Sequence, residues 1–254
     1  MNTKLFYKTG IFVFLLIQLV LFTNCSKKSD PALEEINNTE LVSNEDILRI
    51  GKLHNEIASE LLSGINWDAP NFNEEVIMRF NSSDIVVSSK KSDYTVEFID
   101  EQCNTDKNIE ILREKLSPEG FAIFEQGIKL CENVVSCETF INELEKVEKG
   151  DQMLALPDEE KSTILVSFSI WKNSAYYWLP TDMGGGGEGF AYLTSNKKST
   201  NKWSIKSALV GDGVSGGVGM LGVVVAGACG PIGWTALAIV GGESAVSSVI
   251  NGFN

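Results

Sequence analysis

The spacing of apolar residues predicts a series of amphipathic helices between residues 43 and 180. After Ser43, apolar side chains recur at intervals of three and four residues as far as Gly64. Asp46 follows Ser43 by three positions, which is a variant of the capping box that opens helices. The residues of this stripe are Ile47, Ile50, Leu53, Ile57, Leu61 and Leu62. They predict one helix with a single buried face.

Further helices are predicted from their start and stop signals. Ser117-Pro118 combines an N-cap serine with a proline in the first helical turn. Apolar residues within 140–147 mark the next helix, which Gly150 ends. Because amphipathic helices with short breaks are typical of helical bundles, we expect residues 43–180 to form a mainly α-helical domain.

An aromatic-rich helix is predicted at residues 162–179. Acidic residues after Pro157 complement the dipole of its first turn, and Pro180 stops it. Its aromatic side chains are Phe168, Trp171, Tyr176, Tyr177 and Trp178. Positions 168, 171, 175 and 178 share one helical face, which favours core packing over a membrane-interface belt or a ligand platform.

Glycine and polar residues dominate residues 181–206. Four consecutive glycines at 184–187 are followed by Gly189 and by a polar stretch at 195–201. This composition predicts a flexible linker. No lysine or serine/threonine follows the glycines in the register of a phosphate-binding loop, so phosphate binding is not expected.

Residues 207–254 are apolar and rich in small side chains. Two arms, Leu209–Ala228 and Trp234–Val249, flank the turn sequence Gly-Pro-Ile-Gly at 230–233. The expected helix-packing glycines are Gly213, Gly216, Gly217, Gly219 and Gly222. Because glycine costs about 1 kcal/mol relative to alanine inside an exposed helix, such density favours closely packed helices. We therefore predict a glycine-zipper helical hairpin after the helical domain.

Three arrangements are possible for this hairpin. It can insert into a bilayer, with Asp212 and Glu243 near its outer ends on the aqueous side. It can instead pack as a buried hairpin against the helical domain, or form a mobile, aggregation-prone tail. Bilayer insertion is the leading expectation.

The N-terminus has the pattern of an export signal. Lys4 and Lys8 precede the apolar run 11–22, which gives way to polar residues after Cys25. The run is too short for a permanent membrane span. The arrangement resembles the signal of bacterial lipoproteins, particularly the Bacteroidetes type, although Asn24 replaces the usual small residue. The resemblance implies cleavage of residues 1–24, lipidation of Cys25 and a tether at 25–42; the alternative is an ordinary secretory signal.

A second resemblance concerns the C-terminal part of the chain. The sequence Lys-Trp-Ser-Ile-Lys at 202–206, followed by Gly-Asp-Gly at 211–213, is similar to bacteriocin-like bacterial proteins of the glycine-zipper type. Tyr-Tyr-Trp at 176–178 and the Gly-Lys-Leu-His-Asn-Glu run at 51–56 also resemble elements of uncharacterised bacterial proteins. The resemblance implies membrane-directed behaviour and no named activity.

Charge and composition narrow the partners. The formal net charge is −13, and loss of Lys4 and Lys8 with the signal would make it more negative. Such a chain is repelled by nucleic acid and by anionic lipid, so a lipid anchor explains membrane attachment better than a basic patch. We expect a protein of the cell envelope, held through acylated Cys25, with the outer membrane facing the periplasm or the cell surface as the expected site.

Candidate chemistry is sparse. Cys103, Cys131 and Cys137 are candidates for one disulfide in an oxidising compartment, with the pairing open. His54 is the only histidine and no Cys-x-x-Cys spacing exists, so neither a metal nor a cofactor is expected. We expect His54 to cap a helix or pack beside Trp67 or another aromatic, with a hydrolase using His54 as a minor alternative.

These observations give one leading function and one alternative. The leading expectation is a non-catalytic, membrane-anchored exported lipoprotein that acts through membrane or protein interaction, bacteriocin-like or envelope-associated. Residues 207–254 would provide membrane contact or self-association. The alternative is an extracytoplasmic binding module in which the glycine-rich hairpin belongs to the soluble fold.

Overall fold

The computed structural model describes residues 42–83, 103–195, 203–226 and 234–253. These residues form ten α-helices and one short 3-10 helix, without a strand, so the mainly α-helical prediction is confirmed. The predicted signal, Cys25, nearly all of the tether, and the turn at 230–233 lie outside the described residues.

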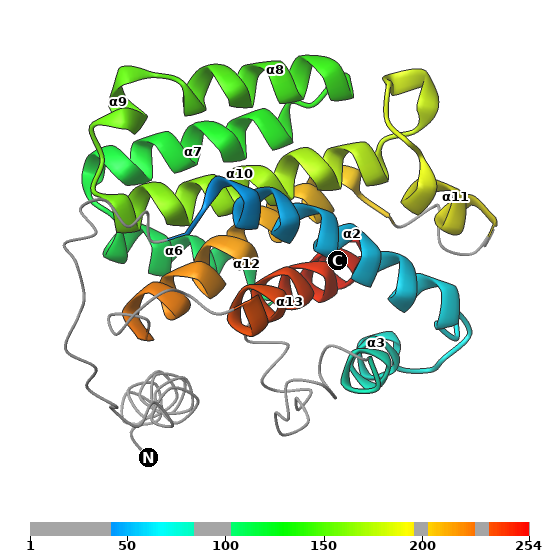
Figure 1. Cartoon of the computed structure of the whole chain (residues 1–254). Helices are drawn as coiled ribbons and strands as arrows, with labels where there is room; N and C mark the ends of the chain where they lie inside the picture. Colours follow the sequence, from blue (N-terminus) through cyan, green and yellow to red (C-terminus); the bar gives the residue numbers. More distant parts are fainter. Residues whose placement is uncertain (1–41, 84–102, 196–202, 227–233, 254) are drawn as a thin grey trace.

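The helices keep the labels of Figure 1. In chain order they are α2 (Asn44–Gly64), α3 (Phe72–Asn81), α6 (Thr105–Lys115), α7 (Pro118–Glu132), α8 (Cys137–Glu148), α9 (Asp151–Leu154), α10 (Asp158–Trp178), η1 (Thr181–Met183), α11 (Glu188–Ser195), α12 (Ile205–Ala226) and α13 (Trp234–Phe253).

Side-chain caps fix several of the helix starts. Ser43 Oγ accepts a hydrogen bond of 3.1 Å from the backbone N–H of Asp46, and Ser117 Oγ accepts one of 3.0 Å from Gly120. Both starts were predicted, because a serine oxygen satisfies a backbone donor that the first turn leaves free. The sequence analysis missed α6, which Asn104 caps in the same way.

Helix α10 is the organising element of the fold. It packs against α7 and α8 on one side, while α2 and α12 contact it elsewhere along its length (Figure 1). The predicted aromatic face is confirmed: Phe168, Trp171, Ala175 and Trp178 are fully buried. Tyr176 points away from this face and is 57% exposed.

The glycine-rich segment forms a helical hairpin that belongs to the same core as the preceding helices. Helices α12 and α13 pack against each other; α12 also contacts α10, α6 and α7, and α13 contacts α2 and α3. One hydrophobic cluster joins Phe124 and Trp171 to Leu209 and Val249. Helices α12 and α13 therefore share one hydrophobic core with the helices that precede them.

Glycines of α12 provide space for side chains of α10. A Cβ atom at Gly213 would collide with the Trp171 ring, one at Gly216 with Ile170, and one at Gly217 would lie 2.8 Å from a side-chain oxygen of α10. Gly219 instead faces Val240 of α13 at 3.3 Å. All five predicted packing glycines are buried, but this zipper mainly faces α10 rather than the other arm of the hairpin.

The predicted flexible linker at 181–206 is ordered over its first part. Residues 181–195 form η1 and α11, and α11 packs against α2 and α10. Gly184 and Gly187 have φ angles of 78° and 72°, the left-handed region that glycine adopts without steric strain. These glycines make a tight turn after α10, which is why their density does not mean flexibility. Residues 196–202 lie outside the described part.

Candidate functional site

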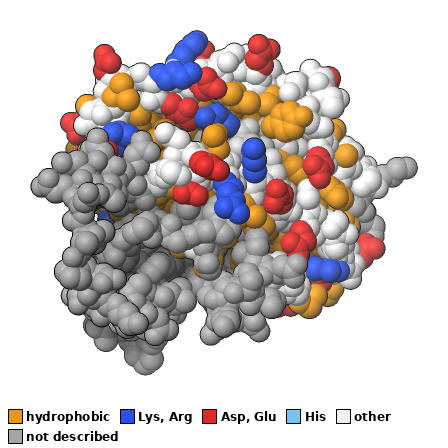
Figure 2. Space-filling model, viewed as in Figure 1, with side chains coloured by type: hydrophobic (Ala, Val, Ile, Leu, Met, Phe, Trp, Pro, Cys, Tyr) orange, Lys and Arg blue, Asp and Glu red, His pale blue; other side chains and the backbone are white. Residues whose placement is uncertain are grey.

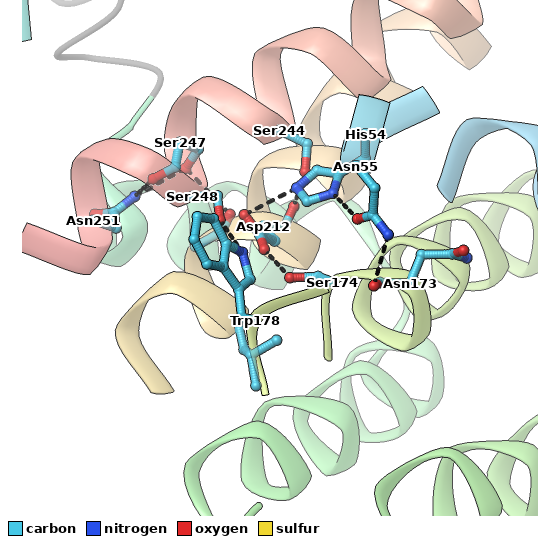
Figure 3. A network of polar contacts seen from close by, with 12 residues as sticks. His54, Asn55, Asn173, Ser174, Trp178, Asp212, Ser244, Ser247, Ser248 and Asn251 are labelled. Carbon is cyan, nitrogen blue, oxygen red and sulfur yellow. Dashed lines mark hydrogen bonds and ion pairs between the residues drawn. The ribbon is translucent and has the colours of Figure 1, made fainter. Parts of the chain in front are cut away.

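A buried contact between His54 and Asp212 is the main polar feature of the core. His54 lies in the middle of α2, and Asp212 lies in the first half of α12. Nε2 of His54 is 3.3 Å from Oδ1 of Asp212, and both side chains are 0% exposed (Figure 3). The first described helix is thus joined electrostatically to the glycine-rich hairpin.

Helices α10 and α13 complete the surroundings of Asp212. Ser174 Oγ of α10 donates a hydrogen bond to Oδ2 of the carboxylate. Ser244 Oγ of α13 donates one of 2.6 Å to the Asp212 backbone carbonyl. Asp212 therefore interacts with α2, α10 and α13 at once, as Figure 3 shows.

Neighbouring amides determine which nitrogen of His54 carries a proton. Asn55 Nδ2 donates a hydrogen bond of 2.9 Å to the backbone carbonyl of Asn173, so the Asn55 oxygen faces the ring. That oxygen lies 2.9 Å from His54 Nδ1 and can only accept. Nδ1 therefore holds a proton, and the imidazolium form also presents an N–H to Asp212.

Electrostatics favour the charged form of His54. Burial alone lowers the pKa of His54, but the charge and hydrogen bonding of Asp212, helped by Asn55, outweigh it and raise that pKa above 6.5. Burial raises the pKa of Asp212, while His54 and Ser174 oppose this shift. The two groups titrate as a coupled pair, and the imidazolium–carboxylate form is the one that their contact stabilises.

Two tryptophans of α10 extend the polar contacts along the hairpin. Trp171 Nε1 donates a hydrogen bond of 2.7 Å to the Leu209 carbonyl, and Trp178 Nε1 donates one of 2.7 Å to Ser248 Oγ. The Trp171 ring reaches the backbone of α12 because Gly213, one turn later, has no side chain. Glycine packing and polar bonding are thus parts of one interface.

The arrangement does not match a nucleophile with its base. Ser174 contacts Asp212 rather than His54, whereas a serine nucleophile needs the histidine as its direct hydrogen-bond partner. His54, Asp212 and Ser174 are all 0% exposed. Two shallow surface depressions, one along α8 and one between the start of α6 and the end of α13, contain none of the three. The geometry is suited to holding helices together.

Several predicted residues lie in other surroundings than expected. His54 pairs with Asp212 and does not pack beside Trp67, whose ring instead lies 5.9 Å from that of Phe72. Asp212 and Glu243 were expected near water at the outer ends of the hairpin, but both are buried. The reason is that the polar groups of four helices converge here and replace water around Asp212.

Cys131 and Cys137 form no disulfide with each other. Both thiols are free, and Cys103, Cys131 and Cys137 are all buried. They precede α6, end α7 and begin α8, respectively, and each belongs to the hydrophobic core. Burial raises the pKa of the Cys131 thiol well above its ordinary value, so it behaves as an apolar side chain. Among the described residues, no group of three or more acidic, histidine or cysteine side chains could hold a metal ion.

Sequence reasoning missed Asp212 as the partner of His54, and it missed the serines of the surrounding network. One signal was available: Asp212 lies in an apolar stretch after the last basic residue of the chain, so its burial requires a partner from elsewhere. Ser174 and Ser248 carried no such signal, because isolated serines within helices are common. No family model, curated protein or solved structure matches this chain.

Proposed function

We propose that the protein is a non-catalytic, lipid-anchored protein of the cell envelope whose helical domain stores a membrane-active hairpin. The observation that carries this proposal is the packing of α12 and α13 against the helices that precede them. Of the described helices, α12 is long and apolar enough to cross a membrane, and 78% of its apolar stretch is buried inside the fold.

The composition of the hairpin supports this proposal. From Gly213 to Ala226 the only polar side chain is Ser215, and no lysine or arginine follows Lys206. A helix that is apolar on all sides suits either a protein core or a bilayer. At 22 and 20 residues, α12 and α13 also have the length that a hydrocarbon core about 30 Å thick requires.

The surface of the domain suits attachment by lipid better than by charge. On the face in Figure 2, acidic and basic side chains intermingle among apolar ones. Lysines of α7, of α8 and directly after α8 pair with acidic residues of these helices: Lys129 with Glu125, Lys146 with Glu143, and Lys149 with Glu145. Because neighbouring carboxylates neutralise these lysines, they offer little attraction to anionic lipid, and acylated Cys25 is the proposed anchor.

The buried network favours a second candidate, a binding module in which the hairpin stays in the core permanently. His54, Ser174, Trp171 and Trp178 all bond to the hairpin within the fold. If these bonds never release, the domain would act by contacting a partner at its surface, and the hairpin would have a structural role only.

Vesicle binding of unlipidated protein distinguishes the two candidates. The chain without its signal, carrying Cys25→Ser, would be mixed with zwitterionic phosphatidylcholine vesicles and floated on a density gradient. We expect a vesicle-bound fraction in which residues 207–254 are protected from protease. The absence of any bound fraction would favour the binding module.

A matched pair of lysine substitutions makes this test specific. Leu221 lies in α12 and is partly buried, so Leu221→Lys would oppose insertion by about 3 kcal/mol, the cost of a charge near a bilayer centre. Leu48, on α2, is 55% exposed, and Leu48→Lys adds the same charge outside the hairpin. Only Leu221→Lys should reduce vesicle binding. Equal binding by both variants would show that the hairpin is not the inserting element.

A further inference from the structure

The energetic difference between the stored and the inserted hairpin lies in its polar bonds. Apolar side chains lose little when they exchange protein neighbours for lipid tails, because both surroundings exclude water. Hydrogen bonds to α2 and α10 have no replacement in hydrocarbon. The groups that hold the hairpin in the domain are therefore the polar groups that it contacts there.

These polar contacts are concentrated in one half of the hairpin, the base half, made of residues 205–215 of α12 and 244–253 of α13. In this half, the Leu209 carbonyl, the Asp212 carboxylate and the Ser248 hydroxyl accept hydrogen bonds from side chains of α10. Asp212 also contacts His54 of α2. In the other half, Met220, Val223 and Val240 pack in an apolar cluster. That cluster is completed by Val42, Ile47, Ile50, Val166 and Ile170.

The His54–Asp212 contact links the base half to α2 through two ionisable groups. Opposite charges attract each other more strongly where water is excluded, and this pair is wholly shielded from water. Removing one member of a buried pair also leaves the other without compensation. Contact with His54 therefore makes the stored position of Asp212 dependent on α2.

We propose that His54, together with Ser174, is a latch that keeps the hairpin in the helical domain through Asp212. The inference rests on the proposed membrane function and adds the contact that controls release of the hairpin. When the latch is intact, Asp212 contacts both His54 and Ser174, and most molecules keep the hairpin folded between α10 and α2. When the latch is broken, the apolar half loses its anchored base and the hairpin partitions into lipid.

The test places the substitution on α2, so that the hairpin sequence is unchanged. His54→Gln in the unlipidated chain would be floated with phosphatidylcholine vesicles beside the parent. We expect the vesicle-bound fraction to rise about tenfold, the effect of losing one buried contact to a charged group. Ser174→Ala removes the contact from α10 to Asp212 and should also increase vesicle binding. If His54→Gln does not fold, Ser174→Ala serves as the test of the latch.

A control separates the latch from general loss of stability. Leu144 is fully buried in α8, which packs on α10 and α7, so Leu144→Ala destabilises the domain away from the hairpin. Even when its unfolding free energy is comparable to that of His54→Gln, Leu144→Ala should bind vesicles near the parent level. Binding by Leu144→Ala equal to that of His54→Gln would overturn the latch, since any destabilisation would then suffice.

The remaining outcomes distinguish the latch from the function on which it rests. If the parent and every variant bind vesicles equally through the hairpin, the latch is wrong and the membrane function stands. If neither the parent nor any folded variant binds vesicles, the membrane function is wrong and the latch is overturned with it.

Discussion

Nε2 of His54 lies 3.3 Å from Oδ1 of Asp212, and no part of either side chain is exposed to solvent. The two residues come from α2 and α12, which are far apart in the chain, and Ser174 of α10 binds the same carboxylate. The Asp212 carboxylate thus connects α2, the first described helix, and α10 to the hairpin. Its removal has consequences that solution experiments can measure.

Single substitutions of the pair should destabilise the domain more than the double substitution does. Asp212→Leu leaves a buried histidine without its counter-charge, and we expect a loss of about 3–5 kcal/mol in unfolding free energy. His54→Leu leaves the carboxylate uncompensated, with a loss of similar size. His54→Leu combined with Asp212→Leu should lose much less than the sum. Urea unfolding of the four proteins measures this, and additive losses would contradict direct coupling.

Stability should decrease as the pH rises through the pKa of His54. That pKa is raised in the folded state, so the folded protein binds a proton more tightly than the unfolded chain. The stabilisation is fully present below the unfolded value of 6.5 and is lost as the pH passes the folded pKa. Burial also raises the pKa of Asp212 above 3.8, so the proton on Asp212 likewise stabilises the folded protein, and this stabilisation is lost as the pH rises through the raised pKa.

Urea midpoints measured from about pH 6 to pH 10 would test this dependence. His54→Gln should flatten the fall above pH 6.5, because glutamine does not titrate. Cys131, the nearby buried thiol, also carries a raised pKa, so Cys131→Ala is the matched control for thiol ionisation. An identical slope in His54→Gln and in the parent would refute the assignment to His54.

Gly213 should tolerate a side chain less well than Gly219. A Cβ atom at 213 would collide with the Trp171 ring and displace it from the Leu209 carbonyl, whereas one at 219 meets Val240 at 3.3 Å. We expect Gly213→Ala to lower the unfolding free energy by about 1–3 kcal/mol, the usual range for overpacking. Gly219→Ala should change it by less, and thermal unfolding of both variants would reveal the order.

Cys131 and Cys137 should be free thiols that the fold protects from modification. Cys131 is fully buried with a raised pKa, so a thiol reagent should label it slowly in the folded protein and rapidly in urea. Cys137 should follow the same pattern. Site-resolved mass spectrometry without reductant provides the measurement. A disulfide-linked peptide that contains Cys131 or Cys137 in the native protein would contradict the free-thiol arrangement.

Local signals of the sequence were sufficient for much of the helical structure. Ser43 and Ser117 cap the helices that their spacing predicts, because capping depends on residues only three positions apart. Helix α6 was missed because only Asn108 and Leu112 of its residues are buried, which leaves a weak apolar pattern. The glycines at 184 and 187 were misread because composition alone does not distinguish a tight turn from a flexible linker.

The candidate site depended on tertiary contacts that no local pattern encodes. His54 was singled out as the only histidine and Asp212 as a carboxylate within an apolar run, but their pairing requires the packing of α2 against the hairpin. The same holds for Gly213 and Gly217, whose spacing predicted close packing but not the partner helix. That partner is α10, because its Trp171 ring occupies the space that a side chain at position 213 would fill.

The packing of α13 against α2 sets the order in which the chain can finish folding. Helices α2 to α10 emerge first during synthesis, yet the core around Trp171 and Trp178 closes only when residues 205–253 have arrived. Contacts between distant parts of a chain delay its collapse into a stable structure. A chain that crosses a membrane unfolded, as the proposed export requires, gains from this delay, because translocation can proceed before the fold becomes stable.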